Sequence, residues 1–174
     1  MNVHVKTSES LYEEILRDLG RPHPFARERV GFVFGRANGI AEGQALLLLT
    51  RYHSIPDDQY VPDNQVGARI GLEAMAWTMM AVHGGRGRRE GLFHVHLHDH
   101  IGPTLPSKVD AIELPRMIPG FRSVSAEAPH GIIILSLDHG SAWVWLPVSE
   151  EPVRAQRISV VGIPVRVFET ESRT

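Results

Sequence analysis

A chain of 174 residues is long enough for one domain with a buried core, and 43% hydrophobic and 22% charged residues are typical of a globular protein. The net charge of −2 argues against nucleic acid as a partner. The absence of cysteine excludes disulfides and cysteine-held metals, so any transition metal must be bound by His, Asp or Glu. We find no signal peptide and no apolar run that would span a membrane, so we expect a soluble cytoplasmic protein with a single domain, residues 1–174.

Hydrophobic periodicity and turn residues predict a chain of mixed helices and strands. A capping box of Ser10 and Glu13 would start the first helix, and the leucine-rich segment 45–52 would be a strand buried on both faces. We expect Pro115 and Pro119 to interrupt a helix that begins near Ser107. The fold class is therefore α/β or α+β, with helices against a central sheet. The expected elements, in chain order, are helix 10–19, strands 30–34 and 45–52, loop 54–64, helix 65–83 with Ile70, Ala74, Trp77 and Ala81 buried, strand 92–97, helix 107–114, and strands 132–137, 142–146 and 158–168, the last with an edge or bulge at Pro164.

Four histidines alternate with other residues from position 94 to position 100. On a strand, this alternation puts His94, His96 and His98 on one face, with neighbouring side chains about 7 Å apart. Two of them can bind one ion if the strand ends there and the rings lean together. A catalytic zinc is held by three protein ligands and keeps a fourth position for water, and Asp110, in the first turn of the next helix, is the best third ligand.

Hydrolysis at such a centre also requires a general base. Glu28, just before a buried strand, is a candidate, although Arg27-Glu28-Arg29 also has the pattern of a solvated charged segment. Ser107 and Asp110 equally have the pattern of a helix cap and a first-turn acid. His130 is expected at the start of a strand, and Trp143 and Trp145 on one face of another, in packing roles.

Taken together, these residues resemble the JAMM metalloproteases, the catalytically competent members of the MPN/JAB-domain family. Glu28-Arg29-Val30-Gly31-Phe32-Val33-Phe34-Gly35 is similar to the family's Glu-x-x-Gly-hydrophobic-hydrophobic-x-Gly segment, and Ser107-Lys108-Val109-Asp110 matches its Ser-x-x-Asp. Between them lies the His-x-His element. The resemblance spans about residues 25–147. The loop at 54–64 and the four-histidine run are similar to the corresponding segments of bacterial JAB proteins that are encoded with ubiquitin-like conjugation systems.

The resemblance implies a fold, a cofactor and a mechanism. The fold would be a single MPN/JAB (cytidine-deaminase-like) domain, a curved mixed sheet flanked by helices. Zn²⁺ would be held by two histidines and Asp110 and would activate water, Glu28 would carry its proton to the leaving nitrogen, and Ser107 would donate to the oxyanion. The substrate would be an isopeptide or peptide bond at the C-terminus of a ubiquitin-like protein, as in deubiquitinase-like processing, with E1-like and E2-like proteins as further partners.

The histidine pair departs from the family pattern, and two pairs stay open. His96 with His98 leaves eight residues before Ser107, one more than is usual in the family, whereas His94 with His96 leaves ten but has Gly91 three residues upstream, as expected. The family's proline after the second histidine is absent. We favour His96 and His98, with His100 outside the ligand set. The alternative functions are a non-catalytic MPN-type binding scaffold and a JAMM hydrolase of small peptide or amino-acid conjugates.

Overall fold

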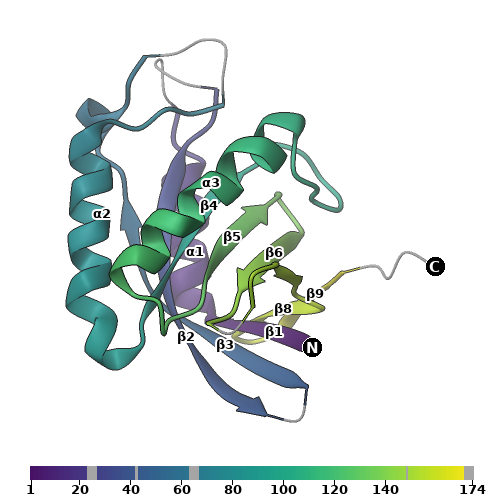
Figure 1. Ribbon diagram of the computed structural model, residues 1–174. Helices are drawn as coiled ribbons and strands as arrows, with labels where there is room; N and C mark the ends of the chain where they lie inside the picture. The colour runs from purple at the N-terminus through teal and green to yellow at the C-terminus, as the bar shows by residue number, and fades with distance from the viewer. Residues whose placement is uncertain (23–26, 42, 63–66, 148, 171–174) are drawn as a thin grey trace.

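One curled, mixed sheet organises the fold (Figure 1). The computed structural model describes residues 1–22, 27–41, 43–62, 67–147 and 149–170, and within them nine strands lie in the order β7-β6-β5-β4-β2-β3-β1-β8-β9. The predicted mixed class is therefore confirmed. The strands are β1 (Asn2–Ser8), β2 (Val30–Ala41), β3 (Gln44–Ser54), β4 (Gly91–Leu97), β5 (His130–Leu135), β6 (Gly140–Trp145), β7 (Val153–Arg154), β8 (Arg157–Val161) and β9 (Arg166–Glu169), and the α-helices are α1 (Glu9–Leu19), α2 (Leu72–Gly85) and α3 (Lys108–Val124).

The helices cover the two faces of the sheet differently. Helix α1 packs on one face, where Tyr12 and Ile15 join Phe93 and Val95 of β4 in one hydrophobic cluster. Helices α2 and α3 pack on the other face, and their cluster includes Phe32 of β2. None of the helices in the described ranges is both long and apolar enough to cross a membrane.

Strand β1 was not predicted, and it moves the start of the first helix. Val3 and Val5 are fully buried, and β1 pairs in parallel with both β3 and β8. The cap of α1 is therefore Ser8, whose side chain accepts a hydrogen bond from the Leu11 backbone N–H, and the predicted capping box of Ser10 and Glu13 is wrong.

Strand β3 is buried mainly on one face, not on both as predicted. Leu47 and Leu49 are 1% and 6% exposed, whereas Leu48 between them is 43% exposed. The strand pairs with β2 in a long antiparallel hairpin that extends away from the helices in Figure 1. Near-continuous leucines thus do not prove two-sided burial, because no element covers the outer face of this hairpin at Leu48 among the described residues.

Helix α2 starts later than predicted because residues 67–71 are not helical. Ile70 forms an isolated bridge with Tyr60, and Gly71 donates a backbone hydrogen bond to Gln59; positions 65 and 66 of the expected helix lie outside the described residues. The buried side of α2 is Ala74, Thr78, Val82 and Gly85. Of the four positions expected to be buried, only Ala74 is, and Trp77 is 41% exposed.

Helix α3 continues through both prolines, so the predicted interruption is wrong. Its buried stripe is Asp110, Leu114, Ile118 and Phe121, at helical spacing. Pro115 and Pro119 are four residues apart, hence on one side of the helix, and are not buried. The carbonyls that lose a partner there can bond to water, while the buried stripe holds the helix together.

The last predicted strand, 158–168, is two strands. β8 and β9 pair antiparallel, and the cis Ile163-Pro164 bond lies in the turn between them. Trp143 and Trp145 belong to the cluster beneath α2 and α3, as expected for a packing role.

Candidate metal centre

Strand β4 presents its histidines in a row on the face covered by α2 and α3. Successive ring centroids from His94 to His100 are 5.5, 4.9 and 5.8 Å apart. His94 and His96 are buried, the side chain of His98 is 19% exposed, and His100 is exposed. The row thus runs from the core to the surface, and only its middle lies at a boundary where a ligand can enter.

The end of β4 brings two of these rings together. The strand ends at Leu97, and the next backbone N–H, that of His98, still donates to Leu135 of β5. The Nε2 atoms of His96 and His98 are 3.1 Å apart. Rings on a regular strand stand about 7 Å apart, so the convergence comes from rings that lean together at the strand end.

The third group comes from the first turn of α3. Ser107 is the N-cap, and its hydroxyl oxygen accepts from the Asp110 backbone N–H, while Asp110 Oδ2 accepts from the Ser107 backbone N–H at 2.8 Å. The same Oδ2 lies 3.6 Å from Nε2 of both His96 and His98. The two interpretations of Ser107 and Asp110 are therefore compatible, since the capping box itself aims the carboxylate at the imidazoles.

The loop between His98 and Ser107 is tied to the β5–β6 turn. Gly102 donates its backbone N–H to Asp138 and accepts from the Ser136 hydroxyl. The Ser141 hydroxyl donates to the carbonyl of Thr104. These contacts set where α3 begins, and they hold its first turn beside β4 without the proline that the family pattern has after the second histidine.

The three converging atoms fit one tetrahedral ion. Ligands bound to zinc at about 2.0–2.1 Å in a tetrahedron lie about 3.3 Å from one another, and the distances here are 3.1, 3.6 and 3.6 Å. Burial tends to raise the pKa of Asp110, but His96 and the hydrogen bonds from Ser107 outweigh it, so the pKa of this carboxyl is held below its ordinary value. Burial lowers the pKa of His98. Asp110 is thus charged and His98 neutral at pH 7, as metal ligands must be.

His94 lies deeper than this triangle. Its ring is in edge contact with Phe32, and burial with the neighbouring His96 lowers its pKa to about 3. Nδ1 of His94 is buried and has no hydrogen-bond partner in the described part of the chain. His100, at the other end, has its Nδ1 3.2 Å from the Ile101 carbonyl. The structure therefore brings His96 and His98, not His94 and His96, into the triangle with Asp110.

Glu28 lies beside the two imidazoles of the triangle, and with His96 and His98 it forms a group that could itself hold a metal ion. Val30, two residues later, is paired with His96 across β2 and β4, and the ligand atoms of Glu28, His96 and His98 are all within 4.8 Å of one another. Burial raises the pKa of Glu28, and the charge of Asp110 adds to this while His96 opposes it. A carboxylate with a raised pKa, beside a possible metal, is suited to take up and release a proton near neutral pH.

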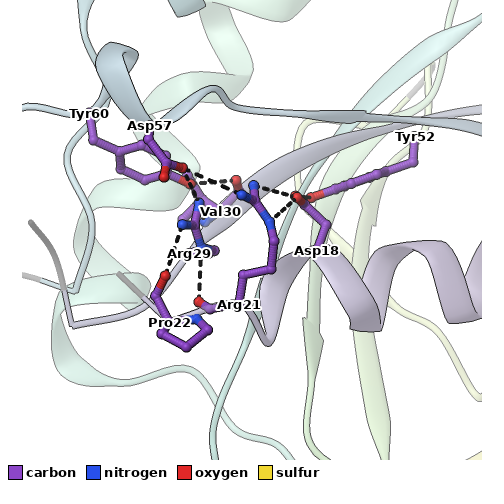
Figure 2. Close-up of polar contacts among 8 residues, drawn as sticks. All are labelled: Asp18, Arg21, Pro22, Arg29, Val30, Tyr52, Asp57 and Tyr60. Atoms are coloured by element: carbon purple, nitrogen blue, oxygen red, sulfur yellow. Dashed lines mark hydrogen bonds and ion pairs between the residues drawn. The ribbon is translucent and has the colours of Figure 1, made fainter. Parts of the chain in front are cut away.

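Arg29 fixes the segment that carries Glu28. Its side chain is 1% exposed, so the alternative interpretation of residues 27–29 as a solvated charged segment does not hold at this residue. The guanidinium donates to the carbonyls of Arg21 and Pro22 and to Asp57 (Figure 2). In the same view, the Tyr60 hydroxyl bonds both the N–H and the carbonyl of Val30. Sequence inspection missed the roles of Arg29 and Tyr60, because these roles depend on contacts with distant segments of the chain.

An open cleft of about 1260 Å³ surrounds these groups. It is lined by Glu28, His96, His98 and Asp110, together with residues 19–22, 67–70 and the first turns of α3. Ser107 lines it as well and is exposed. His130 does not line it, but is fully buried between Leu92 and Ser125, as expected for a packing residue.

Comparisons with known proteins do not identify a family. No family model and no curated protein matches this chain. Among solved structures, the Trichoplax adhaerens STIL N-terminal domain aligns with a TM-score of 0.38 and 11% identity, over 80% of this chain and 40% of the other. The chain thus spans less than half of that structure, and a likeness this low carries no argument about fold or function.

Proposed function

We propose that this protein is a zinc-dependent metallopeptidase or isopeptidase of the JAMM type, with an MPN/JAB fold. The observation that carries the proposal is the convergence of His96 Nε2, His98 Nε2 and Asp110 Oδ2, 3.1–3.6 Å apart, beside the half-buried carboxylate of Glu28. Two imidazoles and one carboxylate are a ligand set of catalytic zinc sites. Their position in an open cleft, not in a sealed core, supports a catalytic over a structural site.

In this proposal His96, His98 and Asp110 hold Zn²⁺, which as a Lewis acid makes a water molecule more acidic and polarises the scissile carbonyl. Glu28 accepts the proton of the attacking water and delivers it to the leaving nitrogen, and its raised pKa makes it a stronger base for the first transfer. The Ser107 oxygen already accepts from the Asp110 N–H, which leaves its own proton available to an oxyanion.

The proposed substrate is the C-terminal tail of a ubiquitin-like protein, joined through a peptide or isopeptide bond. A cleft of about 1260 Å³ exceeds the usual volume of a small-ligand pocket, about 300–1,000 Å³, which favours a polypeptide over a small conjugate. Together with the sequence resemblance, this supports a role beside E1-like and E2-like proteins in a bacterial conjugation system. A chain without cysteine suits the reducing cytoplasm that we propose as its location.

The test combines metal analysis with cleavage. Purified protein should contain about one zinc per chain, and should cleave a ubiquitin-like protein fused through its C-terminus to a reporter. Glu28→Ala should lower turnover about 10²–10⁴-fold while zinc stays bound, whereas Glu14→Ala, an exposed acid on α1, should have no effect. Equal turnover by Glu28→Ala and wild type would refute the mechanism.

The same experiment separates the alternatives. Cleavage of short peptides but not of protein-linked tails would indicate a hydrolase of small conjugates. A folded protein that takes up no zinc on dialysis would indicate a binding scaffold.

A further inference from the structure

The backbone that precedes β2 is hydrogen-bonded to Gly67. The backbone N–H groups of Arg27 and Glu28 both donate to the carbonyl of Gly67, at 2.8 and 3.0 Å. On the far side of Glu28, the buried guanidinium of Arg29 is anchored as Figure 2 shows. Glu28 is therefore fixed at both ends of its backbone, which leaves the direction of its side chain to be set by its neighbours.

The Glu28 side chain is also what an added side chain at position 67 would meet first. A Cβ atom built on Gly67 would lie 1.8 Å from Oε1 and 2.8 Å from Cδ of Glu28, and its three nearest atoms all belong to that side chain. Among the other glycines where an added Cβ would lie under 3.0 Å from another atom, Gly31, Gly91 and Gly131 meet aromatic rings or backbone, and Gly120 meets the end of Met79. Gly162 meets the side chain of Glu9, which does not line the cleft. The carboxylate of Glu28 thus occupies the space that any side chain at position 67 would need.

Conformation does not explain a glycine at this position. The φ angle of Gly67 lies outside the left-handed region, which Gly43 and Gly102 do adopt. The requirement is therefore one of space: alanine can adopt this backbone, but its methyl group collides with the carboxylate.

We propose that Gly67 is a positioning residue, which seats the Glu28 carboxylate against its bare Cα and so directs it toward His96 and His98. This inference rests on the proposed role of Glu28 as general base. Real Cβ contacts essentially never fall below 3.0 Å, so a methyl group at position 67 must displace Oε1 by more than 1 Å. The end of a glutamate side chain can move without disturbing the core, so the protein should fold while the base is misplaced.

The first experiment compares Gly67→Ala with Gly84→Ala. Gly84 lies in α2 with nothing within 4 Å of an added Cβ, which makes it a matched control. A displacement of this size costs about 10²-fold in rate, so Gly67→Ala should lower kcat about 100-fold. KM and zinc affinity should change less than about threefold in the same variant, because the three ligands do not move and only one methyl group is added to the cleft lining. Gly84→Ala should match wild type.

A second arm separates positioning from a general structural role. Glu28→Asp shortens the side chain by one methylene group and withdraws the carboxylate from position 67. In that background, Gly67→Ala should lower kcat by less than about threefold, so the two substitutions are strongly non-additive. A purely structural effect of the methyl group would give the same loss in both backgrounds, and would overturn the proposal.

The structural readout does not depend on activity. In crystal structures of zinc-treated wild type and Gly67→Ala, Glu28 Oε1 should differ in position by more than 1 Å while His96, His98 and Asp110 superimpose. An unmoved carboxylate would overturn the positioning role. A wild-type protein that hydrolyses nothing, yet shows the displaced carboxylate in Gly67→Ala, would refute the proposed function alone.

Discussion

The four histidines illustrate what single residues in a pattern can predict. Alternation on a strand correctly placed His94 and His96 on the face opposite Phe93 and Val95. The alternation did not choose between the two possible pairs, because that choice depends on where β4 ends and how the rings of His96 and His98 lean together. The number of residues between the second histidine and Ser107, which differs by one from the usual family length for the pair His96 and His98, was therefore a weak guide. Choosing the pair required the three-dimensional contacts.

The pair proposed to hold zinc can be tested by removing one ring at a time. His98→Ala should lower zinc affinity more than 100-fold, since losing a ligand exceeds the about 10–100-fold cost of losing a neighbour of a ligand. His100→Ala removes an exposed ring next in the row and should change affinity less than about threefold. Competition with a zinc chelator measures both. If His94→Gln instead had the largest effect, the alternative pair of His94 and His96 would be correct.

A buried histidine outside the site predicts a pH dependence of stability. Burial lowers the pKa of His130 below its ordinary 6.5, against the hydrogen bond to the Ser125 carbonyl, which raises it. Between the lowered pKa and 6.5, His130 is therefore protonated in the unfolded chain but neutral in the folded protein. This contribution to stability is complete above pH 6.5 and is lost as the pH falls from 6.5 toward the lowered pKa.

In the metal-free wild type, the unfolding free energy should fall as the pH is lowered from 6.5 to 5. The slope of this pH dependence should be smaller in His130→Gln, by at most about 1.4 kcal/mol per pH unit, which is the value for one bound proton. Urea unfolding at several pH values measures the slope. The two proteins should show parallel curves above pH 7. Parallel curves below pH 6 as well would contradict the assignment.

At the scale of elements, the errors of prediction have a common cause. Local pattern located α1, β4 and the start of α3, but the extents of α2 and α3 depend on partners. Pro115 and Pro119 would end an isolated helix, and they are tolerated because Leu114, Ile118 and Phe121 bury the opposite side of α3. Strand β1 was missed although Val3 and Val5 alternate with polar residues, a signal that sequence inspection could have used.

Two helix caps allow the local and functional roles of a serine to be separated. Ser8→Ala and Ser107→Ala each remove a side-chain acceptor at a helix N-terminus, of α1 and α3, and each should cost about 1 kcal/mol of stability. Only Ser107→Ala should also weaken zinc binding and slow turnover, because the lost hydroxyl accepts from the backbone N–H of Asp110, whose carboxylate lies 3.6 Å from both imidazoles. Thermal unfolding and zinc titration of both variants provide the comparison. Equal zinc affinity in wild type and Ser107→Ala would show that the cap does not orient Asp110.

At the scale of the whole molecule, the mixed class and helices flanking a sheet were predicted, whereas the nine-strand order was not. Order depends on pairings such as β1 with β8, which join the two ends of the chain and leave no local signal. The candidate site could nevertheless be listed from sequence, because Glu28, the histidines, Ser107 and Asp110 follow the order of the JAMM motif, whereas the local pattern alone left Glu28 undecided.

A bound ion that prefers the folded state must stabilise the whole molecule. With free zinc at about 100 times its dissociation constant, the stabilisation should be about 2.7 kcal/mol, visible as a higher Tm than in chelator. Asp110→Asn should remove most of this difference, while Asp58→Asn, an exposed acid outside the site, should retain it. A Tm unaffected by zinc in wild type would argue against a site that forms on folding.

The site is assembled from parts that lie at very different separations along the chain. His96, His98 and Asp110 belong to one short stretch, whereas Glu28 lies beside them through the pairing of β2 with β4 and the hydrogen bonds to Gly67. In the proposed mechanism, the placement of the base therefore depends on pairing between distant segments, whereas the proposed ligands are close neighbours in sequence.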